Sequence, residues 1–233
     1  MRVRWLAAGA VWALASGMIA GMMGCGLIDS DVLEFDLALP PQMFQYDTSR
    51  AGLPTSGTLP TVPCTSDAMC QVVARNATPN PMACGTTGSC EARIDIQSTV
   101  PYDLKNQSDF AALNDRPIVD VTVSKIEYEL VEDTLTFATP PIGLYVAAQG
   151  VTEPGLGMKF GVIEAVAVGT KPGRYAVKID AAGKKVLADT FKNWKTPFNL
   201  LVKTETPAVF KAGDEVPRGK ISVIVHVTAT ASP

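Results

Sequence analysis

The chain has 233 residues, of which 47% are hydrophobic, and carries 20 basic and 23 acidic side chains for a net charge of −3. This length suits one large domain, or one domain with a small module. Lysine and arginine are dispersed, with Lys184-Lys185 an isolated pair, so the basic stripe that binds nucleic acid phosphates is missing and no nucleic acid partner is expected.

The first 24 residues have the layout of an export signal. Arg2 and Arg4 precede residues 6–23, which contain no charged side chain. The run ends in Met22-Met23-Gly24-Cys25, which resembles the lipobox of bacterial lipoproteins, with Met22 where that family usually has leucine. The resemblance implies cleavage before Cys25 and lipid, including palmitate, on this cysteine. An uncleaved transmembrane anchor is the alternative, because 18 apolar residues approach the shortest membrane span.

Cleavage would divide the chain into a signal peptide at 1–24, a lipidated tether at 25–31 and a domain at 32–233. The mature part keeps 18 basic and 23 acidic residues, a net charge of −5. We expect it to be lipid-anchored in the cell envelope, with the membrane as its partner. Gly26 and Leu27 lack the aspartate that retains some lipoproteins at the inner membrane, which favours the outer membrane.

Four cysteines remain after Cys25, with the spacing C-x5-C-x13-C-x5-C; they are Cys64, Cys70, Cys84 and Cys90. Exported thiols tend to oxidise, so two disulfides are expected, with three pairings open. A tetrahedral zinc site is the alternative, but structural zinc sites usually place about two to four residues between paired cysteines. No metal is therefore assigned.

The cysteine-containing stretches are similar to a short motif in exported proteins of myxobacteria. The resemblance covers fewer than 30 residues, from Cys64 to Cys90. It implies a structural staple within a Pro/Thr/Cys-rich insert at 47–92, which has too few apolar residues to form much core itself.

Alternation of apolar and polar residues is the main signal in the rest of the chain, and it predicts strands. A phase slip at Ser124-Lys125 predicts a β-bulge. Helical spacing is limited to residues 109–114 and 182–194. We therefore predict an all-β fold: an antiparallel β-sandwich (Greek-key-like) with one short crossover helix at 182–194 and a small disulfide-stapled insert. The expected strands are 32–39, 94–96, 119–130, 144–148, 158–168, 174–179, 199–203 and 221–230.

The sequence supplies no catalytic residue and no cofactor motif that we can name. His226 is the only histidine, and alternation places it opposite the valines of its strand, where a solvated histidine needs no partners. The densest acidic cluster is Glu127, Glu129, Glu132 and Asp133. Glu127 and Glu129 would lie about 7 Å apart, a tolerable spacing for glycoside hydrolysis. Alternating glutamates are, however, typical of a half-exposed strand.

Trp194 is the only tryptophan left after cleavage, and with Tyr145 and Tyr175 it is a weak candidate ligand surface. Its helical spacing from Phe191 instead indicates a core position. The favoured function is a non-catalytic binding or structural module, whose partner is an envelope protein or polysaccharide; the alternative is an envelope hydrolase acting on polysaccharide or peptide. A cleft with converging polar groups and perturbed pKa values would indicate an enzyme, and an exposed edge or aromatic patch a binding module.

Overall fold

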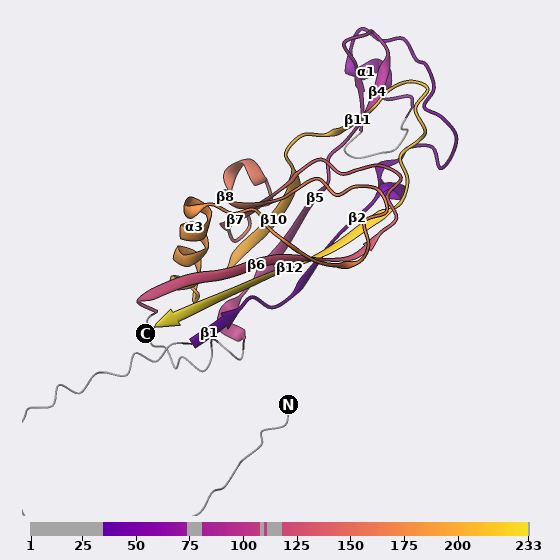
Figure 1. Cartoon of the computed structure of the whole chain (residues 1–233). Helices are drawn as coiled ribbons and strands as arrows, with labels where there is room; N and C mark the ends of the chain where they lie inside the picture. The colour runs from indigo at the N-terminus through magenta and orange to yellow at the C-terminus, as the bar shows by residue number, and fades with distance from the viewer. Residues whose placement is uncertain (1–34, 74–80, 108–109, 111–117, 233) are drawn as a thin grey trace, which may run out of the picture. The chain divides into compact units, whose positions relative to one another are not determined.

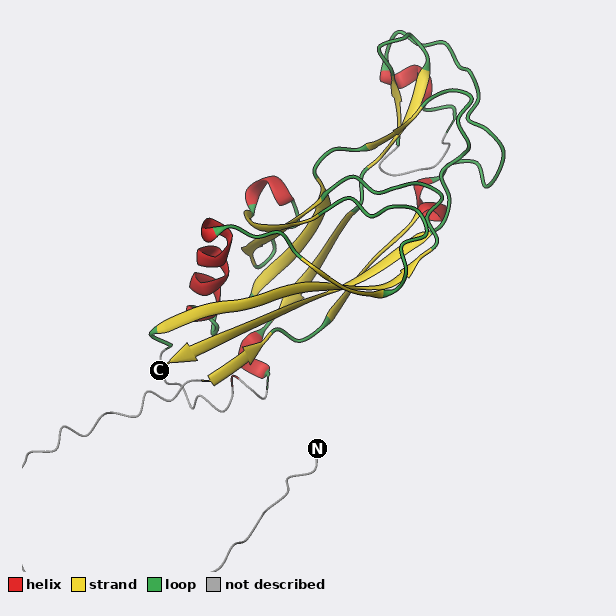
Figure 2. Ribbon diagram, in the orientation of Figure 1, coloured by secondary structure: helices red, strands yellow, loops and turns green. Residues whose placement is uncertain are grey.

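A computed structural model describes residues 35–73, 81–107, 110 and 118–232. The predicted signal peptide, Cys25 and the tether lie outside the described residues, as does nearly all of the helix predicted at 109–114. No helix in the described part of the chain is long and apolar enough to cross a membrane. The fold is an all-β antiparallel sandwich with a small disulfide-bonded insert (Figures 1 and 2).

The first sheet is organised around β12 (Lys220–Ser232), which pairs along nearly its whole length with β6 (Asp120–Asp133). β1 (Phe35–Ala38) and β2 (Gln42–Asp47) pair with successive parts of β12 on its other side, and β9 (Gly173–Ala176) pairs with β6. Apolar and polar side chains alternate along β12, so the apolar side chains share one face of the strand and that face is buried. The buried valines of β12 are Val223, Val225 and Val227.

A β-bulge interrupts β6 at the predicted position. Val123 pairs with Ala229 and Lys125 with Thr228, which leaves Ser124 without a partner residue in β12. The Ser124 hydroxyl donates a hydrogen bond to the Thr228 carbonyl (3.0 Å). The extra residue shifts the alternation by one position, so apolar side chains on both sides of it reach the core. They are Val121, Val123, Ile126, Tyr128 and Leu130.

The second sheet has the order β5 (Gln97–Tyr102), β10 (Phe198–Thr204), β7 (Ile142–Ala148) and β8 (Met158–Ile163). Its apolar side chains share one hydrophobic core with those of the first sheet. Successive strands often change sheet, so most pairings join segments distant in the chain. The predicted crossover helix is α3 (Ala181–Lys192), which connects β9 of the first sheet to β10 of the second and buries Leu187 and Phe191.

The insert contributes β3 (Met82–Cys84) and most of β4 (Cys90–Ile94) to a third sheet, which β11 (Ala208–Phe210), from a later part of the chain, completes in the order β11, β4, β3. A helical turn, α1 (Asp67–Cys70), packs beside it. Two disulfides join Cys64 to Cys84 and Cys70 to Cys90, with Cα separations of 5.7 and 5.5 Å. The predicted disulfides are confirmed, and the pairing is first with third and second with fourth.

Several predicted strands needed correction. The strand expected at 94–96 is two strands, because β4 ends at Ile94 in the insert and β5 begins at Gln97 in the sandwich. The strand expected at 158–168 ends at Ile163. β2, β3 and β11 were not predicted, since each is short or weakly alternating.

Candidate functional site

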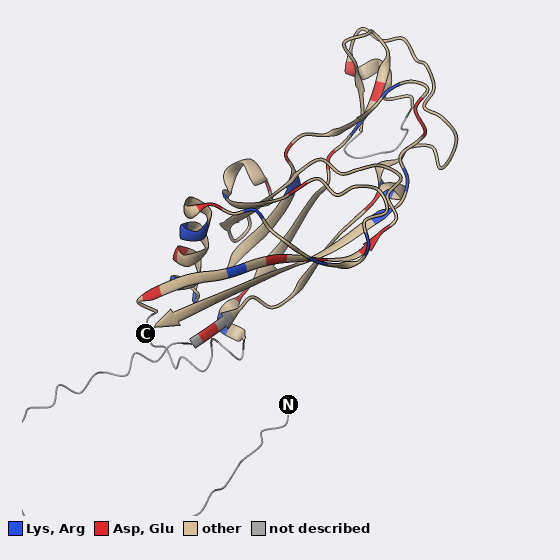
Figure 3. Cartoon of the chain, viewed as in Figure 1, with Lys and Arg blue, Asp and Glu red and all other residues tan. Residues whose placement is uncertain are grey.

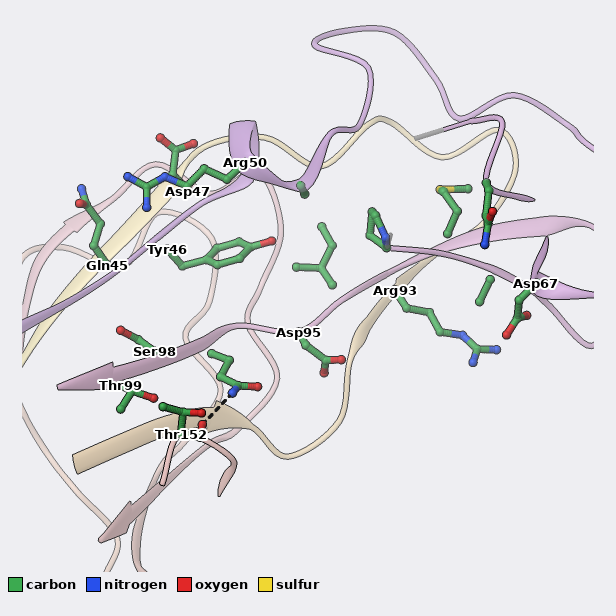
Figure 4. Close-up of a pocket in the computed structure, with 17 residues that line it drawn as sticks. Gln45, Tyr46, Asp47, Arg50, Asp67, Arg93, Asp95, Ser98, Thr99 and Thr152 are labelled. Carbon is green, nitrogen blue, oxygen red and sulfur yellow. Dashed lines mark hydrogen bonds between the residues drawn. The ribbon is translucent and has the colours of Figure 1, made fainter. Parts of the chain in front are cut away.

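A cavity of about 890 Å³ opens where the sandwich meets the disulfide insert. Figure 4 shows its residues: β2 and the short helix η1 (Thr48–Ala51) supply one wall, and the end of β4 with β5 supplies the other. α1 and β3 contribute further lining residues. The volume lies within the range of roughly 300–1,000 Å³ that is usual for ligand sites.

The cavity meets the edges of strands rather than their faces. Three consecutive residues of β2 line it, from Gln45 to Asp47, and so do three consecutive residues of β5, from Gln97 to Thr99. Successive side chains of a strand point to opposite faces, so three in a row can border one space only along the strand's edge. β2 and β5 are the edge strands of their sheets on this side, and their outer backbone is therefore available to a ligand.

Tyr46 stands between the two walls and points into the cavity (Figure 4). Burial of its ring raises the pKa of Tyr46 to about 12, and the carboxylates of Asp47 and Asp95 act in the same direction. Its hydroxyl has no hydrogen-bond partner among the described residues. A neutral phenol with a free donor and acceptor is thus presented to any occupant.

The charged residues of the cavity are arranged so that acid exceeds base. Asp47 lies near Arg50, and the pKa of Asp47 is lowered, chiefly because its carboxylate accepts a hydrogen bond from the Ser49 backbone. Arg93 is held by Glu91, with Nη2 2.8 Å from Oε1. Two further lining carboxylates complete the set, Asp67 and Asp95.

Neither of these two carboxylates has an ion-pair partner within the described ranges. Asp67 accepts a hydrogen bond from the Cys84 backbone (2.8 Å), and Asp95 accepts a longer one from the Thr204 hydroxyl (3.4 Å). The lining itself carries three acids, Asp47, Asp67 and Asp95, against two bases, Arg50 and Arg93, a net charge of −1, and Glu91 pairs with Arg93. The cavity therefore favours cationic over anionic groups.

The only histidine lies elsewhere, on the first sheet. His226 Nε2 is 3.0 Å from Glu129 Oε2, and the same oxygen is 3.5 Å from Arg174 Nε. Figure 3 shows acidic and basic residues following one another along β6, the strand that contains Glu129. His226 and Glu129 are thus part of an ion-pair network on a partly exposed strand face, and neither residue lines the cavity.

The remaining acids of that cluster have structural partners. Glu127 Oε1 is 3.0 Å from Lys125 Nζ, and Glu132 Oε2 is 2.9 Å from Lys220 Nζ. Burial raises the pKa of Asp133, while a hydrogen bond from the Leu135 backbone lowers it. The geometry thus supports charge pairing along the strand rather than a catalytic carboxylate pair.

The aromatic candidates do not form one surface. Trp194 is 4% exposed and packs against Phe110, with ring centroids 5.9 Å apart, so it belongs to the core. Tyr145 lies on β7 of the second sheet and reaches Glu205 (3.4 Å), whereas Tyr175 lies on β9 of the first sheet and stacks on Tyr128. The aromatic residue at the cavity is Tyr46, which the sequence did not single out.

The cysteines lie close together in the insert. The sulfurs of Cys64, Cys70 and Cys90 are within 4.8 Å of one another. Each is already bonded to another sulfur, so none offers the thiolate that a zinc site would require. The four cysteines thus support the wall of the cavity covalently.

Comparisons with known proteins add little to this geometry. No protein-family model and no curated protein matches the chain. A solved chain of turnip yellow mosaic virus aligns with a TM-score of 0.30 and 11% identity, over 98% of this chain and 89% of that chain. One of Desmodium yellow mottle tymovirus has a TM-score of 0.22 and 10% identity, over 100% and 95%. At these scores neither similarity bears on fold or function.

Proposed function

We propose that this chain is a lipid-anchored protein of the bacterial cell envelope that binds an envelope component non-catalytically. The binding site is the cavity bounded by β2, β5 and the disulfide insert. The observation that carries the proposal is the exposure of two strand edges and the free Tyr46 hydroxyl in a space of about 890 Å³. The cavity has the polar lining and the shifted pKa values that would suit an enzyme, but the shifts go the wrong way for catalysis. The pKa of Asp47 is lowered and that of Tyr46 is raised to about 12, so neither group is poised to transfer a proton near neutral pH. The site instead offers hydrogen bonds without a reacting group.

The proposed location in the cell envelope rests on the sequence. The lipobox-like Met22-Met23-Gly24-Cys25 supports lipidation of Cys25, and the oxidised cysteines suit an extracytoplasmic compartment. Three acyl chains, each contributing about 0.8 kcal/mol per buried methylene, would hold the protein on the membrane permanently. The absence of an aspartate after Cys25 favours the outer membrane.

The site can be tested by photo-crosslinking in the producing cells. The full chain would carry photoreactive benzoylphenylalanine in place of Gln97 or Gln71, both exposed residues that line the cavity. The matched control carries it in place of Lys184, which is exposed on α3. We expect a light-dependent adduct of defined mass from the two cavity positions only.

A second substitution links the adduct to the cavity. Tyr46→Ala, added to the chain that carries the photoreactive residue in place of Gln97, removes the aromatic ring and should reduce the adduct while the chain remains folded. Equal adducts from Lys184, or none from either cavity position, would contradict the proposed site.

A further inference from the structure

We propose that the occupant of the cavity is an extended polypeptide segment that adds a strand to the free edge of β5 and places a lysine or arginine beside Asp95. This inference rests on the proposed binding function, and it names the chemical class of the ligand. Three features of the structure support it: the direction of the free backbone groups, the negative charge of the cavity, and the position of Tyr46.

The backbone of β5 has a defined free side. β5 pairs with β10 through all six of its residues, and Pro101 lies opposite Asn199 in that ladder. A proline in an edge strand must direct its nitrogen away from the neighbouring strand, because it has no N–H to donate. Backbone groups alternate sides along an antiparallel strand, so Gln97 and Thr99 direct their N–H and C=O away from β10 as Pro101 does.

A hydrogen bond shows independently which residues of β5 direct their backbone groups toward β10. The Thr204 backbone N–H donates to the Ile96 carbonyl (3.0 Å), so residue 96 faces β10. Gln97 must then face outward, and so must Thr99. Both residues line the cavity, and no other described strand pairs with this edge of β5. Two N–H and two C=O groups are therefore directed toward the cavity, at the spacing an added strand requires.

β2 presents a similar edge on the other side. Asp47 pairs with Lys220, and the residues that follow in the same register are Thr48 and Gly219. The Thr48 N–H donates to the Gly219 carbonyl (3.0 Å). Thr48 thus faces toward β12, and Asp47 and Gln45 face away. β2 and β5 contact each other, and the cavity is bordered by the free edge of each strand, so an extended chain can enter along the edge of β5.

The carboxylates of the cavity favour a basic side chain in the bound peptide. Asp95 begins the segment that leads into β5, and neither Asp95 nor Asp67 forms an ion pair within the part of the chain that the structure describes. A strand paired with Gln97 and Thr99 would pass close to Asp95. A lysine or arginine at that point adds an ion pair, and its hydrocarbon stem can pack on the ring of Tyr46.

The test is selection of displayed random heptapeptides on the full chain. The expected result is enrichment of β-prone sequences with a lysine or arginine at one position. Enrichment should disappear when Thr99→Trp fills the cavity, because Thr99 lines the cavity on the face of β5 opposite the core. A fluorescent copy of the selected peptide, measured by anisotropy, should bind Asp95→Asn roughly two- to fivefold more weakly, as expected for a partly exposed ion pair. Asp36→Asn removes the same charge from exposed β1 and should have no effect.

Backbone pairing needs a separate readout. Methylating the two peptide nitrogens that face β5 removes two hydrogen bonds and should weaken binding by roughly tenfold or more. Methylating the alternate nitrogens serves as the control. If both peptides bind equally, or if selection yields no cavity-dependent basic sequence, the strand-addition proposal is overturned.

The proposed function can survive that result. A hexamer of N-acetylglucosamine serves as an uncharged polysaccharide probe. If it binds the chain and Thr99→Trp blocks it while peptides do not bind, the cavity is a binding site and the peptide proposal is wrong. If neither probe depends on the cavity and the Gln97 crosslink is also absent, the binding function itself fails.

Discussion

Replacing Cys64 and Cys84 together by alanine should loosen the wall of the cavity while leaving the sandwich folded. The buried cluster of the insert is separate from the main core and contains few apolar side chains. Its members are Leu59, Cys64, Cys70, Met82, Cys90, Ala92 and Val216. A cluster of this size cannot hold the insert without its crosslinks, so loss of one disulfide should be felt there first.

The magnitude follows from the loop lengths. Cys64 and Cys84 are 20 positions apart, and the chain-entropy estimate for closing such a loop is about 3 kcal/mol. The two crosslinks overlap, because six positions separate Cys64 from Cys70 and six separate Cys84 from Cys90. With Cys70–Cys90 intact, the shortest ring contains roughly a dozen residues, which still gives about 3 kcal/mol.

Hydrogen exchange measured by mass spectrometry reads out this local stability. A loss of about 3 kcal/mol of local stability makes amides that exchange through local opening exchange roughly a hundredfold faster. We expect that acceleration for amides of β3 and β4, and unchanged exchange for β10 in the sandwich. Exchange of β3 and β4 within about threefold of the unmodified protein would refute the reasoning, and so would equal acceleration in β10.

Three other perturbations test particular contacts. Gly219→Ala should destabilise the fold by about 2–4 kcal/mol in denaturant unfolding, because Gly219 has φ +105° and a Cβ there would overlap the Thr134 carbonyl. Thr139→Val should cost about 1–3 kcal/mol in the same assay, since the buried Thr139 hydroxyl accepts a hydrogen bond from the Val166 N–H (3.0 Å). The raised pKa of Tyr46 predicts loss of stability from pH 10 to about 12, because the unfolded chain ionises this phenol first.

Each of these has a matched control. Gly150→Ala has a similar positive φ of +87° but open space around it, so it should cost less than Gly219→Ala. Thr228→Val lies on an exposed position of β12 and should change stability little. Tyr46→Phe should remove part of the alkaline loss of stability. The predicted contacts would be contradicted if Gly150→Ala cost more stability than Gly219→Ala, or Thr228→Val more than Thr139→Val. They would also be contradicted if Tyr46→Phe left the loss of stability above pH 10 unchanged.

The sequence predicted the longest strands most accurately, because they lie in the middle of the first sheet. β12 and β6 are central in the first sheet, so one face of each strand is buried along most of its length and the alternation is regular. The bulge at Ser124 was visible as a phase slip for the same reason. α3 was visible because Leu187 and Phe191 recur at helical spacing and a cap precedes them, Asp180 accepting a hydrogen bond from the Gly183 N–H (2.7 Å).

The cavity escaped prediction because it is built from edges. Only half of the residues in β2 and β5 are polar, but they do not alternate regularly with the apolar ones, so neither strand shows a clear period of two. Tyr46 and Asp95 come from segments about fifty residues apart, and only the tertiary pairing brings them to one space. The presence of disulfides could be read from the cysteine count, but their pairing could not, since all three connectivities fit the same spacing.

Intact mass spectrometry of the protein from its native membrane, before and after reduction, tests the envelope-anchored account most directly. A lipid-anchored envelope protein should give a mass that begins at Cys25, carries acyl chains and gains four hydrogens when Cys64–Cys84 and Cys70–Cys90 are reduced. An unlipidated mass that retains residues 1–24, or four free thiols, would contradict it.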